Sequence, residues 1–255
     1  MNNKKMKKKS MSTRKLTIIG MLGGISAILG LTPLGFIPIG PANATIMHIP
    51  VIIGAIIEGP IVGALVGLIF GMFSIIRAIT APTVLSPLFY NPLVSILPRV
   101  LIGITAYYSY ILFKKLGKKP SRILLGIMWI STLTYLSYDL YNNLINADNI
   151  FTISIMFKVI LILITGLVGY FLYKKFKENA VEIIISSTVG TLTNTLGVLF
   201  MIYILYGERF VKLTGGDTEY VGKAILALGV ANGIPEVIVA MIIVSGVIIG
   251  LKKKA

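Results

Sequence analysis

The sequence predicts an all-α, polytopic integral membrane protein that crosses the bilayer eight times, with both termini in the cytoplasm. Hydrophobic residues make up 56% of the 255 residues, and the mean hydropathy is +0.90. Charged residues make up only 13%, which is about half of their share in soluble domains. Apolar stretches of about 20 residues, the length that crosses hydrocarbon as a helix, follow one another along the chain. The composition therefore favours a string of membrane spans over one or two soluble domains.

Eight apolar segments define the predicted spans. The second is short for a span, but if it only dipped into the membrane, every later basic loop would move to the outer side. We therefore expect a second crossing, joined to the third by a turn at Glu58-Gly59-Pro60. The segments lie at residues 16–31, 43–57, 61–80, 92–113, 123–141, 153–173, 180–206 and 223–251.

The basic residues predict the orientation in the cell membrane. Of the 24 lysines and arginines, 18 fall in four clusters, at residues 4–15, 114–122, 174–177 and 252–254. Cytoplasmic loops carry such an excess of Lys and Arg, and an inner N-terminus places all four clusters inside. The outer loops are then 32–42, 81–91, 142–152 and 207–222. The net charge of +15 thus reflects topology and contact with anionic lipid, and no nucleic-acid partner is expected.

The start of the chain allows one alternative. A basic region before an apolar segment also fits a cleaved signal peptide. No A-x-A-like site follows, however, and the segment continues into a proline-rich stretch. We therefore expect a cytoplasmic basic arm at residues 1–15 and a single transmembrane domain at 16–255.

Small residues mark one face of the first span. Gly20 and Gly24 lie four residues apart, with Gly23 and Ala27 one position along. Small residues at this spacing let two helices approach closely in lipid. The sequence leaves two interpretations open, packing within the chain or contact with a partner subunit.

Polar residues inside the spans predict a pocket that opens to the outside. Such residues are costly in a membrane and are functional candidates by default. At about 1.5 Å per helical residue, those of five spans fall into one layer in the outer half. Taken singly they have structural explanations, such as snorkelling, an ion pair between Arg99 and Glu236, or hydrogen bonds between helices; together they resemble a small-molecule site. They are His48, Ser74, Arg77, Asn91, Arg99, Asn194, Asn232 and Glu236.

The sequence contains no pattern that indicates an enzyme. It lacks paired carboxylates on one helix face, H-E-x-x-H, G-x-S-x-G and the GxxxxGK[ST] phosphate loop. There is no cysteine, and His48 is the only histidine, which leaves little for a metal site. We therefore expect no catalytic residue, metal or cofactor in this chain; if ATP drives transport, a partner subunit must hydrolyse it.

Four motifs resemble the substrate-binding S components of energy-coupling factor (ECF) vitamin transporters, closest to the pantothenate-specific type. They are "TPLGFIPIGPANATIMHIPVIIGAIIEGPIVGALVGLIFGMFS", "NPLVSILPRVLIG", "GTLTNTLGVL" and "NGIPE", in the family's order, and cover about half of the chain. The resemblance implies a six-helix core that binds a vitamin from outside with high affinity. It also implies a transmembrane coupling subunit and two ABC-type ATPases as partners, and toppling of the S component in the membrane during transport.

The chain departs from the family's pattern in two places. Where the first helix of the family carries an Ala-x-x-x-Ala coupling motif, this chain has Gly20 and Gly24, which preserve a close contact. Residues 116–179 resemble an insertion of two helices between the family's fourth and fifth. Two extra crossings preserve the orientation of the rest, and the sequence indicates no function for them.

The resemblance also implies roles for the site residues. The proline-rich stretch 32–50 holds the outer loop where the family keeps a lid, and Asn43, Thr45 and His48 would supply hydrogen bonds at the pocket mouth. Pantothenate has a carboxylate, two hydroxyls and an amide. Arg99 would bind the carboxylate, Asn194 and Asn232 the amide and hydroxyls, and Phe70 and Phe89 would be walls. Glu236 would repel an anion unless it is paired or faces a hydroxyl.

Alternative functions remain open at this point. Within the class, the ligand could be another water-soluble vitamin or precursor. From other classes, the chain could be a self-sufficient ion-coupled carrier or an integral membrane enzyme.

Overall fold

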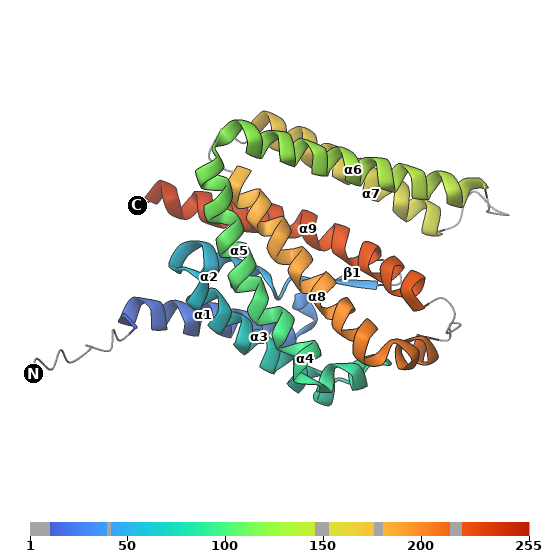
Figure 1. Ribbon diagram of the computed structural model, residues 1–255, viewed down its shortest axis with the longest axis horizontal. Helices are drawn as coiled ribbons and strands as arrows, with labels where there is room; N and C mark the ends of the chain where they lie inside the picture. The colour runs from blue at the N-terminus through green and yellow to red at the C-terminus, as the bar shows by residue number, and fades with distance from the viewer. Residues whose placement is uncertain (1–10, 40–41, 146–152, 176–180, 215–220, 255) are drawn as a thin grey trace, which may run out of the picture.

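The computed structural model describes residues 11–39, 42–145, 153–175, 181–214 and 221–254. These residues form a bundle of helices with one two-stranded hairpin (Figure 1). The helices are α1 (Thr13–Leu31), α2 (Ile49–Glu58), α3 (Pro60–Thr80), α4 (Pro92–Ser95), α5 (Leu97–Leu116), α6 (Lys118–Ile145), α7 (Ile153–Lys175), α8 (Val181–Thr214) and α9 (Val221–Lys254). The strands are β1 (Phe36–Ile39) and β2 (Ala42–Thr45), and two 3-10 turns are η1 (Pro33–Gly35) and η2 (Ser86–Tyr90).

Six helices among the described residues are long and apolar enough to cross a membrane. They are α1, α3, the consecutive pair α4–α5, α6, α8 and α9. α2 has 10 residues and is therefore about 15 Å long, half of a hydrocarbon core of about 30 Å. In α7 the apolar stretch is the short segment Lys158–Leu167. The helical membrane class is confirmed, whereas the count of eight crossings stays a prediction.

The sharp turn between α2 and α3 is the one expected at Glu58-Gly59-Pro60. Gly59 has a φ of 100°, a conformation that residues with a Cβ rarely adopt. Pro60 begins α3, where its missing N–H costs no helical hydrogen bond. Arg14 Nε lies 2.8 Å from Glu58 Oε1, so an ion pair ties the start of α1 to this turn.

Glycines bring α3 and α5 into backbone contact. A Cβ on Gly67 would lie 2.1 Å from the carbonyl oxygen of Arg99, and one on Gly63 would lie 2.8 Å from the Cα of Gly103. Small residues allow such close approach in a membrane, where van der Waals packing drives helix association. The contact places the first turn of α5, which carries Arg99, directly against the middle of α3.

The proline-rich loop after α1 forms the hairpin of β1 and β2. The strands are antiparallel, with Phe36 opposite Thr45 and Ile39 opposite Ala42. Pro38 lacks an N–H donor, which an edge strand of a two-stranded hairpin tolerates. β2 packs against α9, so the loop lies over the helix that carries Asn232 and Glu236. The all-α prediction therefore holds for the membrane helices and omits this hairpin.

α6 and α7 form a pair along one side of the bundle, next to α8 and α9 (Figure 1). Lys158 Nζ lies 2.5 Å from Asp139 Oδ2, so an ion pair joins the two helices. They correspond to the predicted insertion at residues 116–179, of which residues 146–152 and 176–179 lie outside the described part.

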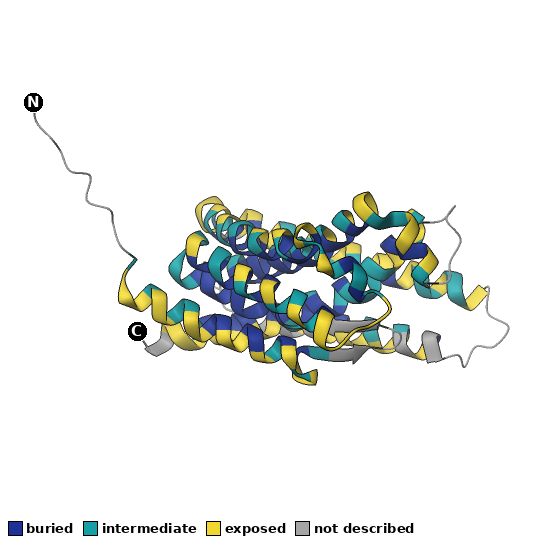
Figure 2. Cartoon of the chain, turned by 90° about the horizontal axis from the view of Figure 1, so that it is seen from below, coloured by how far each residue is buried: buried dark blue, intermediate teal, exposed yellow. Residues whose placement is uncertain are grey.

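Buried residues gather in the centre of the bundle, and exposed residues follow its outer faces (Figure 2). Many exposed side chains are large and apolar; on α6, for example, Ile123, Ile127 and Ile130 are all exposed. Their spacing of three to four residues defines one face of a helix. An apolar exterior of this kind suits contact with lipid.

Candidate functional site

A buried carboxylate joins the hairpin to two helices. Glu236 lies on α9 directly after Pro235 and is 4% exposed. Its Oε1 accepts hydrogen bonds from the backbone N–H and the hydroxyl of Thr45, each at 2.8 Å. Its Oε2 accepts a hydrogen bond from the Thr195 hydroxyl on α8 at 2.6 Å. Glu236 therefore ties β2 to α8 and α9, and it does not form the ion pair with Arg99 that the sequence left open.

His48 connects the start of α2 to α8. It is fully buried, and its Nε2 lies 3.0 Å from the Thr191 hydroxyl. Its Nδ1 is buried and has no hydrogen-bond partner in the described part of the chain. One ring nitrogen is thus held by the protein, and the other remains to be satisfied.

Arg99 places a buried cation near two aromatic rings. It lies in the first turn of α5 and is 6% exposed. Its Nη1 donates a hydrogen bond to the Val94 carbonyl at 2.5 Å, while its Nε is buried without a partner. The guanidinium carbon lies 5.4 Å from the ring centre of Phe70 and 5.7 Å from that of Phe89. Aromatic faces stabilise a cation, and the unused N–H donors can bind an anion.

Two asparagine side chains complete the polar cluster. Asn194 is buried on α8 between Thr191 and Thr195. Asn232 lies on α9 one turn before Glu236, so the two share a helix face. The Oδ1 atoms of both asparagines are buried without a hydrogen-bond partner among the described residues. Each offers an acceptor to a hydroxyl or an amide N–H.

The unpartnered atoms concentrate in this cluster. Within the described residues, five buried side-chain nitrogen or oxygen atoms lack a hydrogen-bond partner. Four of them are His48 Nδ1, Arg99 Nε, Asn194 Oδ1 and Asn232 Oδ1, and the fifth is Trp129 Nε1 on α6. Leaving a buried polar group unpaired costs about 1–3 kcal/mol. A polar ligand that paired with these four atoms would recover that free energy, which is the chemistry of a binding site.

Other predicted site residues make structural contacts in this structure. Arg77 donates a hydrogen bond to the Gly30 carbonyl at 2.8 Å, and its guanidinium lies 4.1 Å from the ring centre of Phe36. It therefore holds the end of α1 and the start of the hairpin. Asn91 caps α4 by accepting a hydrogen bond from Leu93 N at 2.9 Å and donates one to the Tyr206 hydroxyl at 3.1 Å.

The remaining predicted site residues are two aromatic side chains, a serine and an asparagine. Phe70 is buried and Phe89 is partly buried, both beside Arg99. Ser74 is half-buried on α3. The backbone of Asn43 lies in β2, and its side chain is outside the described part of the structure.

Gly20 and Gly24 differ from the glycine between them. Both are exposed, and a Cβ on either would meet no atom within 4 Å. A Cβ on Gly23, by contrast, would lie 2.5 Å from Ile69 Cδ1. Gly23 is therefore the residue that packs inside the chain, and Gly20 and Gly24 leave a smooth open strip on α1.

Thr191 and Thr195 were not among the predicted site residues. They lie one turn apart on α8 and bind His48 and Glu236, respectively. The repeat of threonines in "GTLTNT" is the signal that could have found them. Threonines in membrane helices commonly bond to carbonyls of their own helix, which concealed this role.

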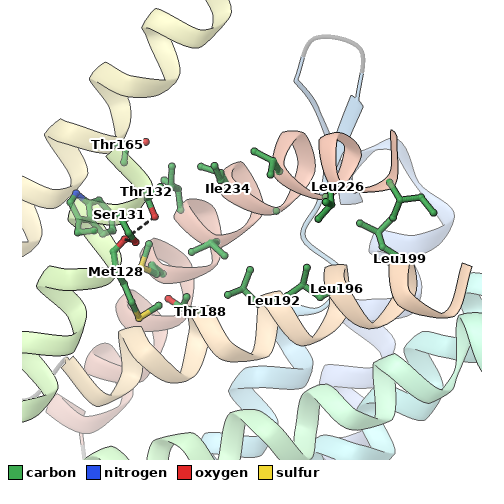
Figure 3. A pocket seen from close by; sticks show the side chains of 18 of the residues that line it. Met128, Ser131, Thr132, Thr165, Thr188, Leu192, Leu196, Leu199, Leu226 and Ile234 are labelled. Carbon is green, nitrogen blue, oxygen red and sulfur yellow. Dashed lines mark hydrogen bonds between the residues drawn. The ribbon is translucent and has the colours of Figure 1, made fainter. Parts of the chain in front are cut away.

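An apolar cavity in the described structure lies away from this cluster. It has a volume of about 640 Å³ and lies between α6–α7 and α8–α9, with an almost wholly apolar lining (Figure 3). None of the clustered polar residues lines it. We assign the polar site to the cluster around Arg99, because a polar ligand needs the hydrogen-bonding groups that the cavity lacks. No three metal-ligating side chains converge among the described residues.

Comparisons with known proteins bear on this site. The chain matches the model of the family described as "ECF transporter, substrate-specific component" over residues 14–147 and 123–248. It is 36% identical to the pantothenic acid transporter PanT of Lactococcus lactis over 84 residues, which are 28% of this chain and 43% of that protein. It is 34% identical to the pantothenate transporter PanT of Leuconostoc mesenteroides over 105 residues, 41% of this chain and 50% of that protein. The matches therefore span half the length of these relatives or less.

Proposed function

This chain belongs to the family of substrate-specific components of ECF transporters, and from that membership we propose that it binds pantothenate from the outer side of the membrane. In this proposal, the bound vitamin is then taken up together with a transmembrane coupling subunit and two ABC-type ATPases. The partner ATPases use ATP, and this chain supplies the binding site.

The observation that carries the proposal is the set of four buried, unpartnered atoms around Arg99. A vitamin with a carboxylate, hydroxyls and an amide matches them in kind. The guanidinium binds the carboxylate, and the Oδ1 atoms of Asn194 and Asn232 accept hydrogen bonds from hydroxyls and the amide N–H. Phe70 and Phe89 cover the apolar part of the ligand. The names of the two relatives favour pantothenate within this chemical class.

Glu236 has a positioning role in this proposal. Its oxygens are held by Thr45 and Thr195, so it does not need to face the ligand carboxylate. Because one of its partners lies on β2, it holds the hairpin of residues 36–45 over the site as a lid. With its oxygens held in this way, the Glu236 carboxylate does not repel the carboxylate of the ligand as a free carboxylate would.

The proposed topology has eight crossings with both termini in the cytoplasm. It combines a six-helix core with an inserted pair, α6 and α7. The Arg14–Glu58 ion pair supports it, because it keeps the basic start of α1 and the α2–α3 turn on one side of the bundle. The hairpin then lies on the outer side, where a vitamin arrives.

The proposed contact with the coupling subunit is the strip of Gly20 and Gly24. Both positions are open in this chain, so a partner helix can approach the α1 backbone closely.

The proposal is tested by identifying the ligand that the purified protein retains. The protein is isolated from cells in mild detergent and denatured, and the released small molecules are identified by mass spectrometry. Pantothenate at close to one molecule per protein is expected. Retention of a different vitamin would support the binding site but contradict pantothenate as its ligand. Absence of any retained ligand, together with no calorimetric response to added pantothenate, would contradict the binding function itself.

A further inference from the structure

The cavity beside the α6–α7 pair has the dimensions of a hydrocarbon chain. Along α8 its lining runs from Thr188 to Tyr203, a length of about 22 Å at 1.5 Å per residue. This exceeds the half-thickness of a bilayer core, about 15 Å. The cavity, hereafter the groove, is therefore long enough to hold an extended acyl chain.

Of the polar groups that line the groove, the serine and threonine hydroxyls are satisfied within their own helices, whereas Trp129 Nε1 is buried without a partner among the described residues. The serine and threonine hydroxyls gather at one end of the groove, and leucines such as Leu196, Leu199 and Leu226 line the other (Figure 3). Each of these four hydroxyls donates to a carbonyl of its own helix; the residues are Ser131, Thr132, Thr165 and Thr188. With its hydroxyl protons used in this way, the lining favours hydrocarbon over a polar ligand.

A cationic hollow adjoins the leucine end of the groove. It has a volume of about 770 Å³ and shares Tyr203 and Gly222 with the groove. Among the described residues, its lining includes two cations, Arg209 and Lys212, and one carboxylate, Glu208. Neither Arg209 nor Lys212 is in an ion pair within the described part of the chain. The described lining of the hollow therefore has an excess of positive charge at the point where the apolar groove ends.

We propose that the hollow and the groove form one binding site for a membrane phospholipid. The phosphate lies at Arg209 and Lys212, which pair with phosphate oxygens through charge-assisted hydrogen bonds. One acyl chain passes Gly222 and lies in the groove between α6–α7 and α8–α9. This juxtaposition of a cationic hollow and an apolar groove matches the two parts of a phospholipid, and it does not depend on the vitamin site. The bound chain fills the space between the inserted helix pair and the rest of the bundle.

The only tryptophan of the chain reports on this site. Trp129 lines the groove, so a brominated acyl chain that enters it quenches the tryptophan fluorescence. The purified protein in detergent is titrated with phosphatidylglycerol that carries brominated chains. We expect saturable quenching with one lipid per protein. The methyl ester of the same brominated fatty acid, which lacks the phosphate, should bind about thirtyfold more weakly, about fivefold for each cation.

Two matched variants separate the site from bulk contact with lipid. A Cβ on Gly222 meets no atom within 4 Å, so Gly222→Leu is tolerated and obstructs the passage between hollow and groove. Gly246 on the same helix is equally open and lines neither, so Gly246→Leu is the control. We expect Gly222→Leu to abolish saturable quenching and Gly246→Leu to retain it. The double variant Arg209→Gln, Lys212→Gln should weaken phosphatidylglycerol binding about thirtyfold.

Other outcomes overturn the proposal. Quenching that does not saturate, or that is the same in the Gly222→Leu variant, means that lipid contacts Trp129 only from the bulk. Equal affinities for the phosphatidylglycerol and the methyl ester would show that the phosphate does not contribute to binding. Calorimetry with pantothenate on the same variants should give wild-type affinity, so a failure here is distinguishable from a failure of the vitamin site.

Discussion

The substitution Arg99→Gln removes the buried cation of the polar cluster and retains a side chain that can form hydrogen bonds. Arg99 is 6% exposed, so water screens its charge little. Truncating one partner of a buried, hydrogen-bonded charge pair costs about 2–5 kcal/mol. The dissociation constant of pantothenate should therefore rise by about 30-fold to 4,000-fold.

The measurement is isothermal titration calorimetry with two ligands. Pantothenol carries an alcohol in place of the carboxylate and therefore does not use the cation. The Arg99→Gln variant should bind pantothenol with nearly wild-type affinity and lose its preference for pantothenate. Because Arg99 also donates to Val94, circular dichroism and a thermal melt accompany the titration to show that the variant folds.

Arg77→Gln is the matched control. Arg77 contacts Gly30 and Phe36 instead of the cluster, so this variant should keep the preference for pantothenate over pantothenol. Equal losses for both ligands in Arg99→Gln, or undiminished pantothenate binding, would refute the assignment of Arg99 to the carboxylate.

Three further predictions follow from the contacts of α1, α3 and α9. Gly24→Leu should block uptake by the complete transporter in cells, while calorimetry should show unchanged vitamin affinity. Undiminished uptake would show that the strip of Gly20 and Gly24 does not contact the coupling subunit. Glu236→Gln weakens the hydrogen bonds to Thr45, so the vitamin should dissociate faster. With an engineered Ala42→Cys, the bound vitamin should also protect the cysteine less against an impermeant thiol reagent. Protection equal to that in the parent protein would contradict the role of the hairpin as a lid. Gly67→Ala places a Cβ 2.1 Å from the Arg99 carbonyl and should lower both the melting temperature and the vitamin affinity, and a wild-type melting curve would show that α3 and α5 can separate freely.

The depth of the polar residues was predictable because helix rise is nearly constant. Arg99, Asn194 and Glu236 were expected in one layer, and the structure brings them together with His48. Depth does not specify the direction around a helix. Arg77 was expected in the same layer, but it turns to the end of α1, where a carbonyl and an aromatic ring bind it.

The partners of Glu236 could not be predicted from the sequence. An ion pair with Arg99 was one open interpretation, since the two charges are opposite and similar in depth. The structure gives the carboxylate three hydrogen bonds from Thr45 and Thr195. Thr45 lies 191 residues away in the chain, and its position depends on the hairpin, which hydropathy does not reveal.

Glycine spacing likewise predicted that helices approach closely, but it did not specify which glycines make the contact within the chain. Gly20, Gly23 and Gly24 share the pattern of small residues, yet only Gly23 faces another helix of the chain. On α3, Gly63 and Gly67 pack against α5. Which face of a small-residue helix is internal depends on the packing of the whole bundle, so it required the structure.

The most direct test of the account uses the chain alone, reconstituted in liposomes with no coupling subunit or ATPase. Radiolabelled pantothenate is added outside, and the bound and accumulated label are measured by rapid filtration. We predict saturable binding of one pantothenate per outward-facing protein, with no accumulation in the lumen under an ion gradient. Absence of binding would contradict the vitamin site, and gradient-driven accumulation would show a self-sufficient carrier instead of a binding subunit.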